Sequence, residues 1–197
     1  MTLAVRDLSV SYGRKEVLRG LAMDARPGTL TAIVGPNGSG KSTLIKAICG
    51  DLSYVGNIQL NGIEVANAKP WDLAAMRGVL PQASTLAFPF HAIEVVRIGQ
   101  TSGMGADHVG RAEAALVRVG LRDYAHRYYQ ELSGGEQQRV QLARVLAQIW
   151  EPTAKDGPRW LMLDEPVSSL DIAHQLQVMS IARNFAQAGG GVVAVMH

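Results

Sequence analysis

The sequence has a single cysteine and lacks both a Cys/His cluster for zinc and a long apolar run. Cys49 alone cannot form a disulfide within the chain. No Cys and His residues are spaced as in a zinc site, and no apolar run approaches the roughly 18 residues of a membrane helix. The first residues do not have the basic and apolar segments of a signal peptide. We therefore expect a protein that is cytoplasmic or lies against the cytoplasmic face of a membrane.

The excess of positive charge is also small. Lys and Arg together number 19 and Asp and Glu 17, which leaves a formal net charge of +2. This balance does not provide the basic surface of a nucleic-acid-binding domain, so no nucleic acid is expected as a partner. Hydrophobic residues make up 47% of the chain and charged residues 18%, which is typical of a packed core and not of a disordered chain.

The N-terminal part of the chain alternates short β-leaning runs with turn residues. The runs lie at 3–10, 16–25, 29–34 and 55–65. Asn61-Gly62 within the last run is a favourable hairpin turn. A glycine-rich loop at 35–40 follows the third run and opens a predicted helix at 41–49.

Beyond residue 70 the pattern changes. From about Pro70 to Trp150 it is mainly helical, with glycine and tyrosine breaks. Short apolar runs at 160–163 and 191–196 then flank a predicted helix at 171–187, which is the order of a βαβ unit. The chain is therefore expected to be an α/β protein whose core comes from both ends of the sequence, with a helical insertion between them.

The glycine-rich loop has the pattern of a nucleotide-binding site. Its sequence GPNGSGKS agrees with G-x-x-x-x-G-K-[ST] at every fixed position. The residues expected to bind the nucleotide are Gly35, Pro36, Asn37, Gly38, Ser39, Gly40, Lys41, Ser42 and Thr43. Glycines let consecutive N–H groups curl around phosphate oxygens, while Lys41 supplies a charge for the outer phosphates and Ser42 a hydroxyl ligand for Mg²⁺. A dinucleotide fingerprint is excluded because no glycine stands three positions after Gly40, so the loop predicts a nucleoside triphosphate site.

Two carboxylates follow the apolar run at 160–163. Such a strand is buried on both faces, so its carboxyl end delivers Asp164 and Glu165 to the crevice in which α/β proteins bind ligands. Asp164 would orient Mg²⁺ or its water, and Glu165 would polarise a water for in-line attack on the γ-phosphate. Alone, such a pair is more often a solvated helix cap. Together with the phosphate loop it favours the catalytic interpretation.

A second glycine-containing helix start lies at 132–137, where the sequence is LSGGEQ. Ser133 and Glu136 have the spacing of a capping box, which by itself indicates ordinary helix initiation. The two glycines between them leave the first turn without side chains, so an anion could reach the backbone N–H groups. Since the chain already has a phosphate loop, this site would serve another phosphate or the nucleotide of another subunit.

These motifs, in this order and over essentially all of the chain, resemble those of ATP-binding cassette (ABC) ATPases, and 132–137 match the signature sequence of that family. The resemblance implies an α/β fold with a P-loop (RecA-like) core, an N-terminal antiparallel β subdomain and an inserted helical subdomain. It implies one domain over 1–197, in which 1–82 form the β subdomain and P-loop core, 83–150 the helical subdomain and 151–197 the rest of the core.

The resemblance also assigns roles to single residues, with ATP and Mg²⁺ as cofactors. Tyr12 would stack on adenine, Gln82 would be the Q-loop glutamine, 168–171 the D-loop, and His197 the switch histidine. Catalysis is then expected from Glu165, Gln82 and His197, and the metal is expected on Ser42, Gln82 and Asp164. The signature and D-loop residues expected to bind nucleotide are Ser133, Gly134, Gly135, Gln137 and Asp171. Without the family context, a surface tyrosine, a loop amide, a helix cap and a solvated histidine would be the ordinary interpretations.

Members of this family work as head-to-tail dimers, so each ATP would lie between the phosphate loop of one copy and the signature helix of a second copy. More narrowly, the segments 78–82, 88–90, 94–96 and 151–159 resemble those of hemin-import ATP-binding subunits. This resemblance predicts ATP-driven hemin uptake through an integral membrane permease. A periplasmic or surface substrate-binding protein would deliver the hemin to that permease. The segment 82–100 would then line the groove for a permease helix.

Three further points follow from the resemblance. Import of a ferric siderophore or cobalamin is one alternative, and a soluble ABC ATPase without a permease is another. The expected location is the cytoplasmic face of the cell (inner) membrane, as a peripheral protein. Because the family continues beyond the switch histidine, we interpret the chain as a truncated form.

Overall fold

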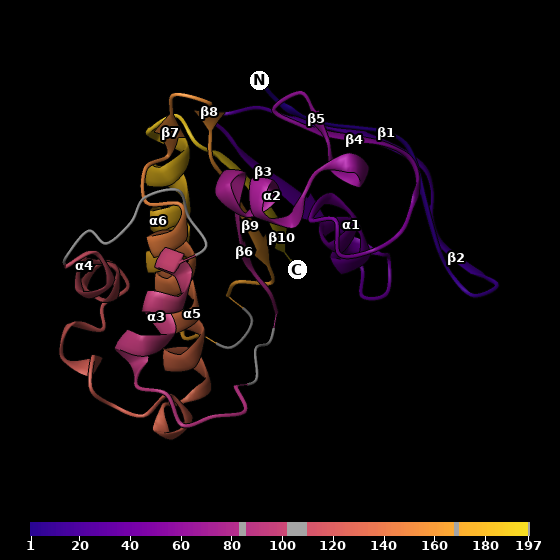
Figure 1. The fold of residues 1–197 in the computed structure, drawn as a ribbon. Helices are drawn as coiled ribbons and strands as arrows, with labels where there is room; N and C mark the ends of the chain where they lie inside the picture. Colours follow the sequence, from indigo (N-terminus) through magenta and orange to yellow (C-terminus); the bar gives the residue numbers. More distant parts are fainter. Residues whose placement is uncertain (83–85, 102–109, 168–169, 197) are drawn as a thin grey trace.

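Figure 1 shows the computed structural model, which describes residues 1–82, 86–101, 110–167 and 170–196. Ser168, Ser169 and His197, which belong to the predicted D-loop and switch, lie outside these residues. The described strands form two four-stranded sheets and one two-stranded hairpin. The helices are α1 (Lys41–Ile48), α2 (Pro70–Met76), α3 (Ala92–Thr101), α4 (Arg111–Arg118), α5 (Gly134–Gln148) and α6 (Ile172–Gln187), with 3-10 turns at Val65–Asn67, Arg122–Tyr124 and Tyr129–Glu131.

The first sheet is antiparallel. Its strands are β1 (Leu3–Tyr12), β2 (Lys15–Ala25), β4 (Val55–Leu60) and β5 (Ile63–Glu64), in the order β2-β1-β4-β5. Leu3, Val5 and Leu8 of β1 are fully buried. Asn61 and Gly62 between β4 and β5 have φ values of 54° and 85°, the left-handed pair that a tight hairpin turn needs. The hairpin predicted at these two residues is therefore confirmed.

The second sheet is parallel and forms the centre of the core. Its strands are β3 (Leu30–Val34), β10 (Gly191–Met196), β9 (Trp160–Asp164) and β6 (Arg77–Leu80), in the order β3-β10-β9-β6. Every residue of β9 is buried. Because all four strands run in one direction, their carboxyl ends and the loops that leave them meet at one edge of the sheet.

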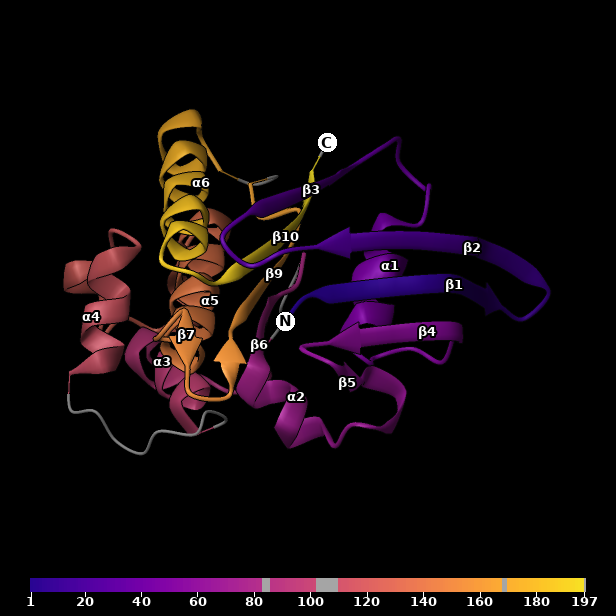
Figure 2. The ribbon, with the colours of Figure 1, turned by 90° about the horizontal axis from the view of Figure 1, so that it is seen from above.

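Helices cover both faces of the parallel sheet (Figure 2). Leu44 of α1 shares an apolar cluster with Trp160 of β9 and with Leu3 of β1, so α1 lies between the two sheets. On the other face, Leu161 of β9 belongs to the cluster that includes α5 and α6. Successive side chains of a strand point to opposite faces, and this alternation divides the core into two clusters.

Two short β elements depart from the predicted pattern. β6 interrupts the region predicted as mainly helical, because its four residues pair in parallel with the distant β9. A hairpin of β7 (Thr153–Ala154) and β8 (Gly157–Pro158) precedes β9. Elements this short show too little periodicity to be recognised in a sequence.

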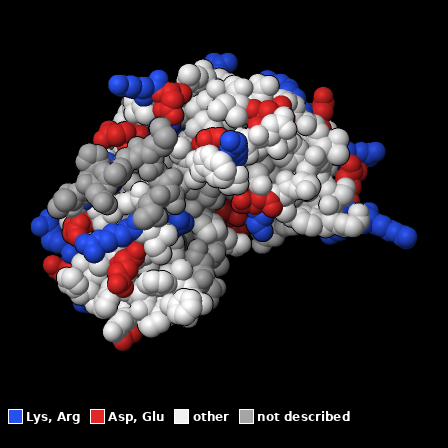
Figure 3. All heavy atoms as spheres, in the orientation of Figure 1, with Lys and Arg blue, Asp and Glu red and all other residues white. Residues whose placement is uncertain are grey.

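Two surface properties complete the description. On the face seen in Figure 3, basic and acidic side chains are interspersed. Among the described residues, no helix combines the length and the apolar character needed to cross a membrane.

Gly99 tests how closely α3 and α5 pack. A Cβ at this position would lie 2.1 Å from the backbone oxygen of Arg144 in α5. Gly99→Ala should therefore lower the free energy of unfolding by about 1–3 kcal/mol, although alanine is the better helix former by about 1 kcal/mol. Urea unfolding followed by circular dichroism measures the change. Gly134→Ala is the control, because nothing lies within 4 Å of its Cβ position. An equal loss in both variants would contradict the close packing.

Candidate functional site

The phosphate loop connects β3 to α1, and its conformation depends on glycine. Gly38 and Gly40 have φ values of 78° and 95°, a region that other residues rarely adopt. A Cβ on Gly40 would also lie 2.7 Å from a methyl carbon of Leu18 in β2. Position 40 therefore needs glycine both for its backbone and for the strand packed against it.

Lys41 turns back over the loop from the first position of α1. Its side chain is buried, and Nζ donates hydrogen bonds to the carbonyl oxygens of Gly35 (2.8 Å) and Pro36 (3.1 Å). The ammonium group and the positive end of the α1 dipole thus lie at the same place, which favours an anion there.

Ser42 and Asp164 bring two hard oxygen ligands together. The Ser42 hydroxyl donates to Oδ1 of Asp164 at 3.0 Å, which joins the first turn of α1 to the end of β9. Asp164 is 5% exposed, and burial raises its pKa, which the Ser42 hydrogen bond partly offsets. A hydroxyl and a carboxylate in this arrangement are the kind of ligands that Mg²⁺ prefers, so the donor set fits that ion.

Glu165 lies next to Gln82, the predicted Q-loop glutamine. Nε2 of Gln82, which follows β6, donates to Oε2 of Glu165 at 2.7 Å. The pairing of β6 with β9 brings these residues to one edge of the sheet. Glu165 has a φ of 51°, a left-handed conformation that costs about 1–3 kcal/mol in a residue other than glycine. Such backbone strain in a residue that carries a candidate catalytic group indicates that the fold holds this residue in place.

A cleft of about 330 Å³ joins these elements. It is lined by Val17, Asn37, Gly38, Gly40, Lys41, Ser42, Thr43, Gln82 and Glu165. The phosphate loop, Gln82 and Glu165 thus meet in one place, and Asp164 is bonded to Ser42 of the same lining. A larger cavity of about 580 Å³ lies beside Cys49 and Arg77, and no predicted site residue within the described part of the chain lines it.

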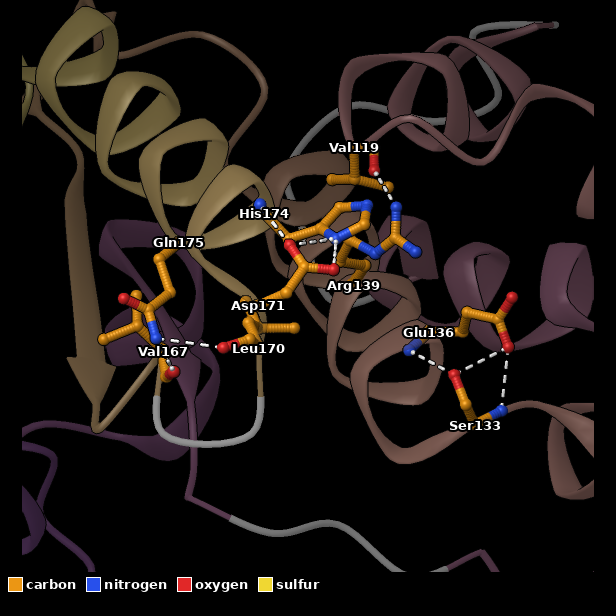
Figure 4. Close-up of polar contacts among 9 residues, drawn as sticks. All are labelled: Val119, Ser133, Glu136, Arg139, Val167, Leu170, Asp171, His174 and Gln175. Atoms are coloured by element: carbon orange, nitrogen blue, oxygen red, sulfur yellow. Dashed lines mark hydrogen bonds and ion pairs between the residues drawn. The ribbon is translucent and has the colours of Figure 1, made fainter.

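The start of α5 forms a complete capping box (Figure 4). The Ser133 hydroxyl oxygen accepts from the Glu136 N–H (3.3 Å), and Oε2 of Glu136 accepts from the Ser133 N–H (2.8 Å). Those contacts from Ser133 lower the pKa of Glu136. Ser133 and Gly134 are exposed, so the first turn is open to solvent. Helix initiation is therefore confirmed here, and the open turn is also compatible with the predicted second phosphate contact.

Among the described residues, Gln137, Asp171 and Tyr12 are not part of the lining of this cleft. Gln137 donates to the carbonyl oxygens of Tyr129 and Leu132. Asp171 caps α6, where it accepts from the His174 N–H at 2.9 Å (Figure 4). Tyr12 is half exposed at the end of β1. Their predicted contacts with nucleotide stay predictions, as does the role of His197, which lies outside the described residues.

Two residues of the site carry no signal in the sequence. Val17 lines the cleft from β2, and Gln138 of α5 donates to the carbonyl oxygen of Glu165 at 3.3 Å. Neither belongs to a fixed position of the motif patterns. Only the packing of distant segments places them at the site.

Asp164→Asn should stabilise the metal-free protein. Burial raises the pKa of Asp164, so folding disfavours its charged form; this penalty is present above the folded-state pKa and disappears as the pH falls through it. Asparagine keeps an acceptor for Ser42 without the charge, and we expect a gain of about 0.5–2 kcal/mol at neutral pH. Thermal unfolding with a chelator across a pH series measures it. A gain that persists unchanged in acid would contradict the burial of the charge.

Comparison with known proteins identifies the family. The model of the ABC transporter family matches residues 18–168. The hemin import ATP-binding protein HmuV of Roseobacter denitrificans is 58% identical over 197 residues, which are 100% of this chain and 76% of that protein. HmuV of a Ruegeria species is 59% identical over 197 residues, again 100% of this chain and 76% of that protein.

Solved structures agree in fold. An ATP-binding subunit of an ABC transporter aligns with a TM-score of 0.86 at 24% identity, over 100% of this chain and 80% of that one. An inward-facing metal-chelate type ABC transporter, described as putative, aligns with a TM-score of 0.76 at 27% identity, over 100% of this chain and 73% of that one. The P-loop fold and the cleft agree with what these relatives indicate. The chain belongs to the ABC transporter family and is an ATPase of that family.

Proposed function

We propose that this chain is the ATP-hydrolysing subunit of an importer that moves hemin through a membrane permease. The observation that carries the proposal is the cleft in which Lys41, Gln82 and Glu165 meet. The hemin cargo is supported by 58% identity, over the whole chain, to a protein named as a hemin import ATP-binding subunit.

Each group in the cleft has a chemical task in this proposal. Lys41 binds the outer phosphates of ATP in place of the carbonyl oxygens of Gly35 and Pro36 that it now contacts. Ser42, Asp164 and Gln82 would hold Mg²⁺, which supplies charge neutralisation for the phosphates. Glu165 orients the attacking water and accepts its proton while the bond between the γ-phosphorus and ADP breaks. Gln82, bonded to Glu165, helps to keep that carboxylate at the cleft.

A second copy of the chain would complete the site. The signature residues Ser133 and Gly134 are exposed, yet they do not line the cleft of their own copy. In a head-to-tail dimer they would face the nucleotide of the partner, together with Gly135, Gln137 and Asp171, while Tyr12 would stack on adenine. A second glycine-containing helix start, capped and open to solvent, supports this arrangement.

The permease would receive the energy of dimer closure. The segment 82–100, which follows β6 and includes most of α3, would line the groove for a cytoplasmic helix of the permease. The protein would then lie on the cytoplasmic face of the membrane, and an external binding protein would deliver the cargo. One alternative cargo has an observation of its own, because a similar solved structure is described as a metal-chelate type transporter. A ferric siderophore is such a chelate, and cobalamin belongs to the same group of alternatives.

Glu165→Gln tests the catalytic assignment. Glutamine keeps the size of the side chain but cannot accept the proton of water, so phosphate release from MgATP should fall by about 100-fold or more. ATP affinity should stay within about twofold, because this interaction is made in the transition state. A coupled phosphate assay and nucleotide binding by fluorescence measure both quantities.

Lys41→Ala is the contrasting variant. It removes the charge that binds the outer phosphates, so it should weaken ATP binding as well as turnover. If Glu165→Gln hydrolyses ATP at the rate of the unmodified protein, the catalytic role proposed for Glu165 is wrong.

The cargo is tested by transport. Vesicles that contain the permease and this chain should take up hemin in an ATP-dependent manner, and the Glu165→Gln vesicles should not. The same vesicles are offered a ferric siderophore and cobalamin in turn. ATP-dependent uptake of either one, without uptake of hemin, would replace hemin as the cargo.

A further inference from the structure

The backbone of Glu165 is held from two sides. Its N–H donates to the carbonyl oxygen of Val195 in β10 at 3.2 Å, and its carbonyl oxygen accepts from Nε2 of Gln138 in α5 at 3.3 Å. With a φ of 51°, Glu165 has a conformation that persists only when its surroundings hold it. Gln138 supplies one of the backbone contacts that do so.

Gln138 belongs to the helix that begins with the signature residues. Ser133 caps this helix, and Gln138 lies little more than one turn beyond it. The next residues, among them Val140 and Leu142, are buried, so α5 is packed as a rigid element. A shift of the start of α5 relative to the parallel sheet would therefore change the hydrogen bond to Glu165.

Only the donor half of the Gln138 amide has a hydrogen-bond partner among the described residues. Oε1 of Gln138 is buried and has no hydrogen-bond partner among the described residues. A buried polar group with an unused acceptor is less favourable than an apolar side chain of the same length. The donor on Nε2 is the part of the side chain that an apolar residue could not replace.

We propose that Gln138 is a positioning residue for the hydrolysis step. It orients the backbone of Glu165, and it makes that orientation depend on the position of the signature helix. Gln138 does not line the cleft, so it acts through Glu165 and not on the nucleotide. The position of the Glu165 carboxylate then depends on Gln82, which bonds the side chain of Glu165, and on Gln138, which bonds the backbone of Glu165. This inference rests on the proposed role of Glu165.

Gln138→Met tests the proposal, because methionine has a similar length but no N–H donor. We expect kcat for ATP to fall about tenfold or more, as for a small misplacement of a catalytic group. KM and ATP affinity should stay within about twofold, since Gln138 does not line the cleft and reaches the site only through the backbone of Glu165. Gln138→His should recover most of kcat, because its Nε2–H can donate from nearly the same distance.

Gln148→Met is the matched control. Gln148 lies on the same helix and donates to the backbone carbonyl oxygens of Ala74 (2.8 Å) and Arg77 (3.1 Å), away from Glu165. The Gln148→Met substitution should lower Tm while leaving kcat within about twofold of that of the unmodified protein. If packing alone mattered at position 138, Gln138→Met would keep a higher kcat and Tm than Gln138→His. In that case kcat would also fall together with Tm in both Gln138→Met and Gln148→Met.

The outcomes separate the two proposals. Loss of kcat in Gln138→Met with recovery in Gln138→His supports the positioning role. Unchanged kcat in Gln138→Met, while Glu165→Gln is inactive, overturns the role of Gln138 and leaves the proposed function intact. Full turnover in Glu165→Gln overturns both. If Gln138→Met fails to fold, Gln138→Asn takes its place, because its amide is one methylene too short for the same contact; unchanged kcat there would overturn the role equally.

Discussion

The structure depends on the parallel pairing of β9 with β10 on one side and β6 on the other. This pairing buries every residue of β9 and places its last residue, Asp164, at the edge where β3 delivers the phosphate loop. The same pairing brings Gln82, just after β6, within hydrogen-bond distance of Glu165. Three segments that are far apart in the sequence, those after β3, β6 and β9, thus contribute to one cleft, because parallel strands end at a common edge.

Several residues at this edge are less favourable for the stability of the fold than uncharged or unstrained residues would be at the same positions. Asp164 is a buried carboxyl with a raised pKa, and Glu165 has a left-handed backbone. Lys41 is buried, with its ammonium group bonded to backbone carbonyl oxygens. Each of these features is explained by the ligand chemistry proposed for the cleft, because anion and metal binding need charges that water does not fully screen. The apolar clusters on the two faces of the sheet supply the stability that this edge does not.

The signature helix is the element that links the parts of the site. Its first turn is open to solvent, which is compatible with the proposed contact with a second copy, while its following residues reach into the core. Arg144 donates to the carbonyl oxygen of Val79 in β6. Gln138 donates to Glu165. Side chains of one helix therefore contact the strand that leads to Gln82 as well as the residue that follows Asp164.

The sequence by itself determined the features that depend on local pattern. The phosphate loop, the capping box at Ser133, the turn at Asn61-Gly62 and the βαβ unit at the C-terminal end could be predicted, because each needs particular residues at fixed short spacings. Strand β6 and the β7–β8 hairpin could not be predicted, since short strands take their conformation from a distant partner. Only the tertiary structure brought Gln82 and Gln138 to Glu165 and Val17 to the phosphate loop. Those contacts result from the pairing and packing of whole elements, which no local spacing of residues encodes.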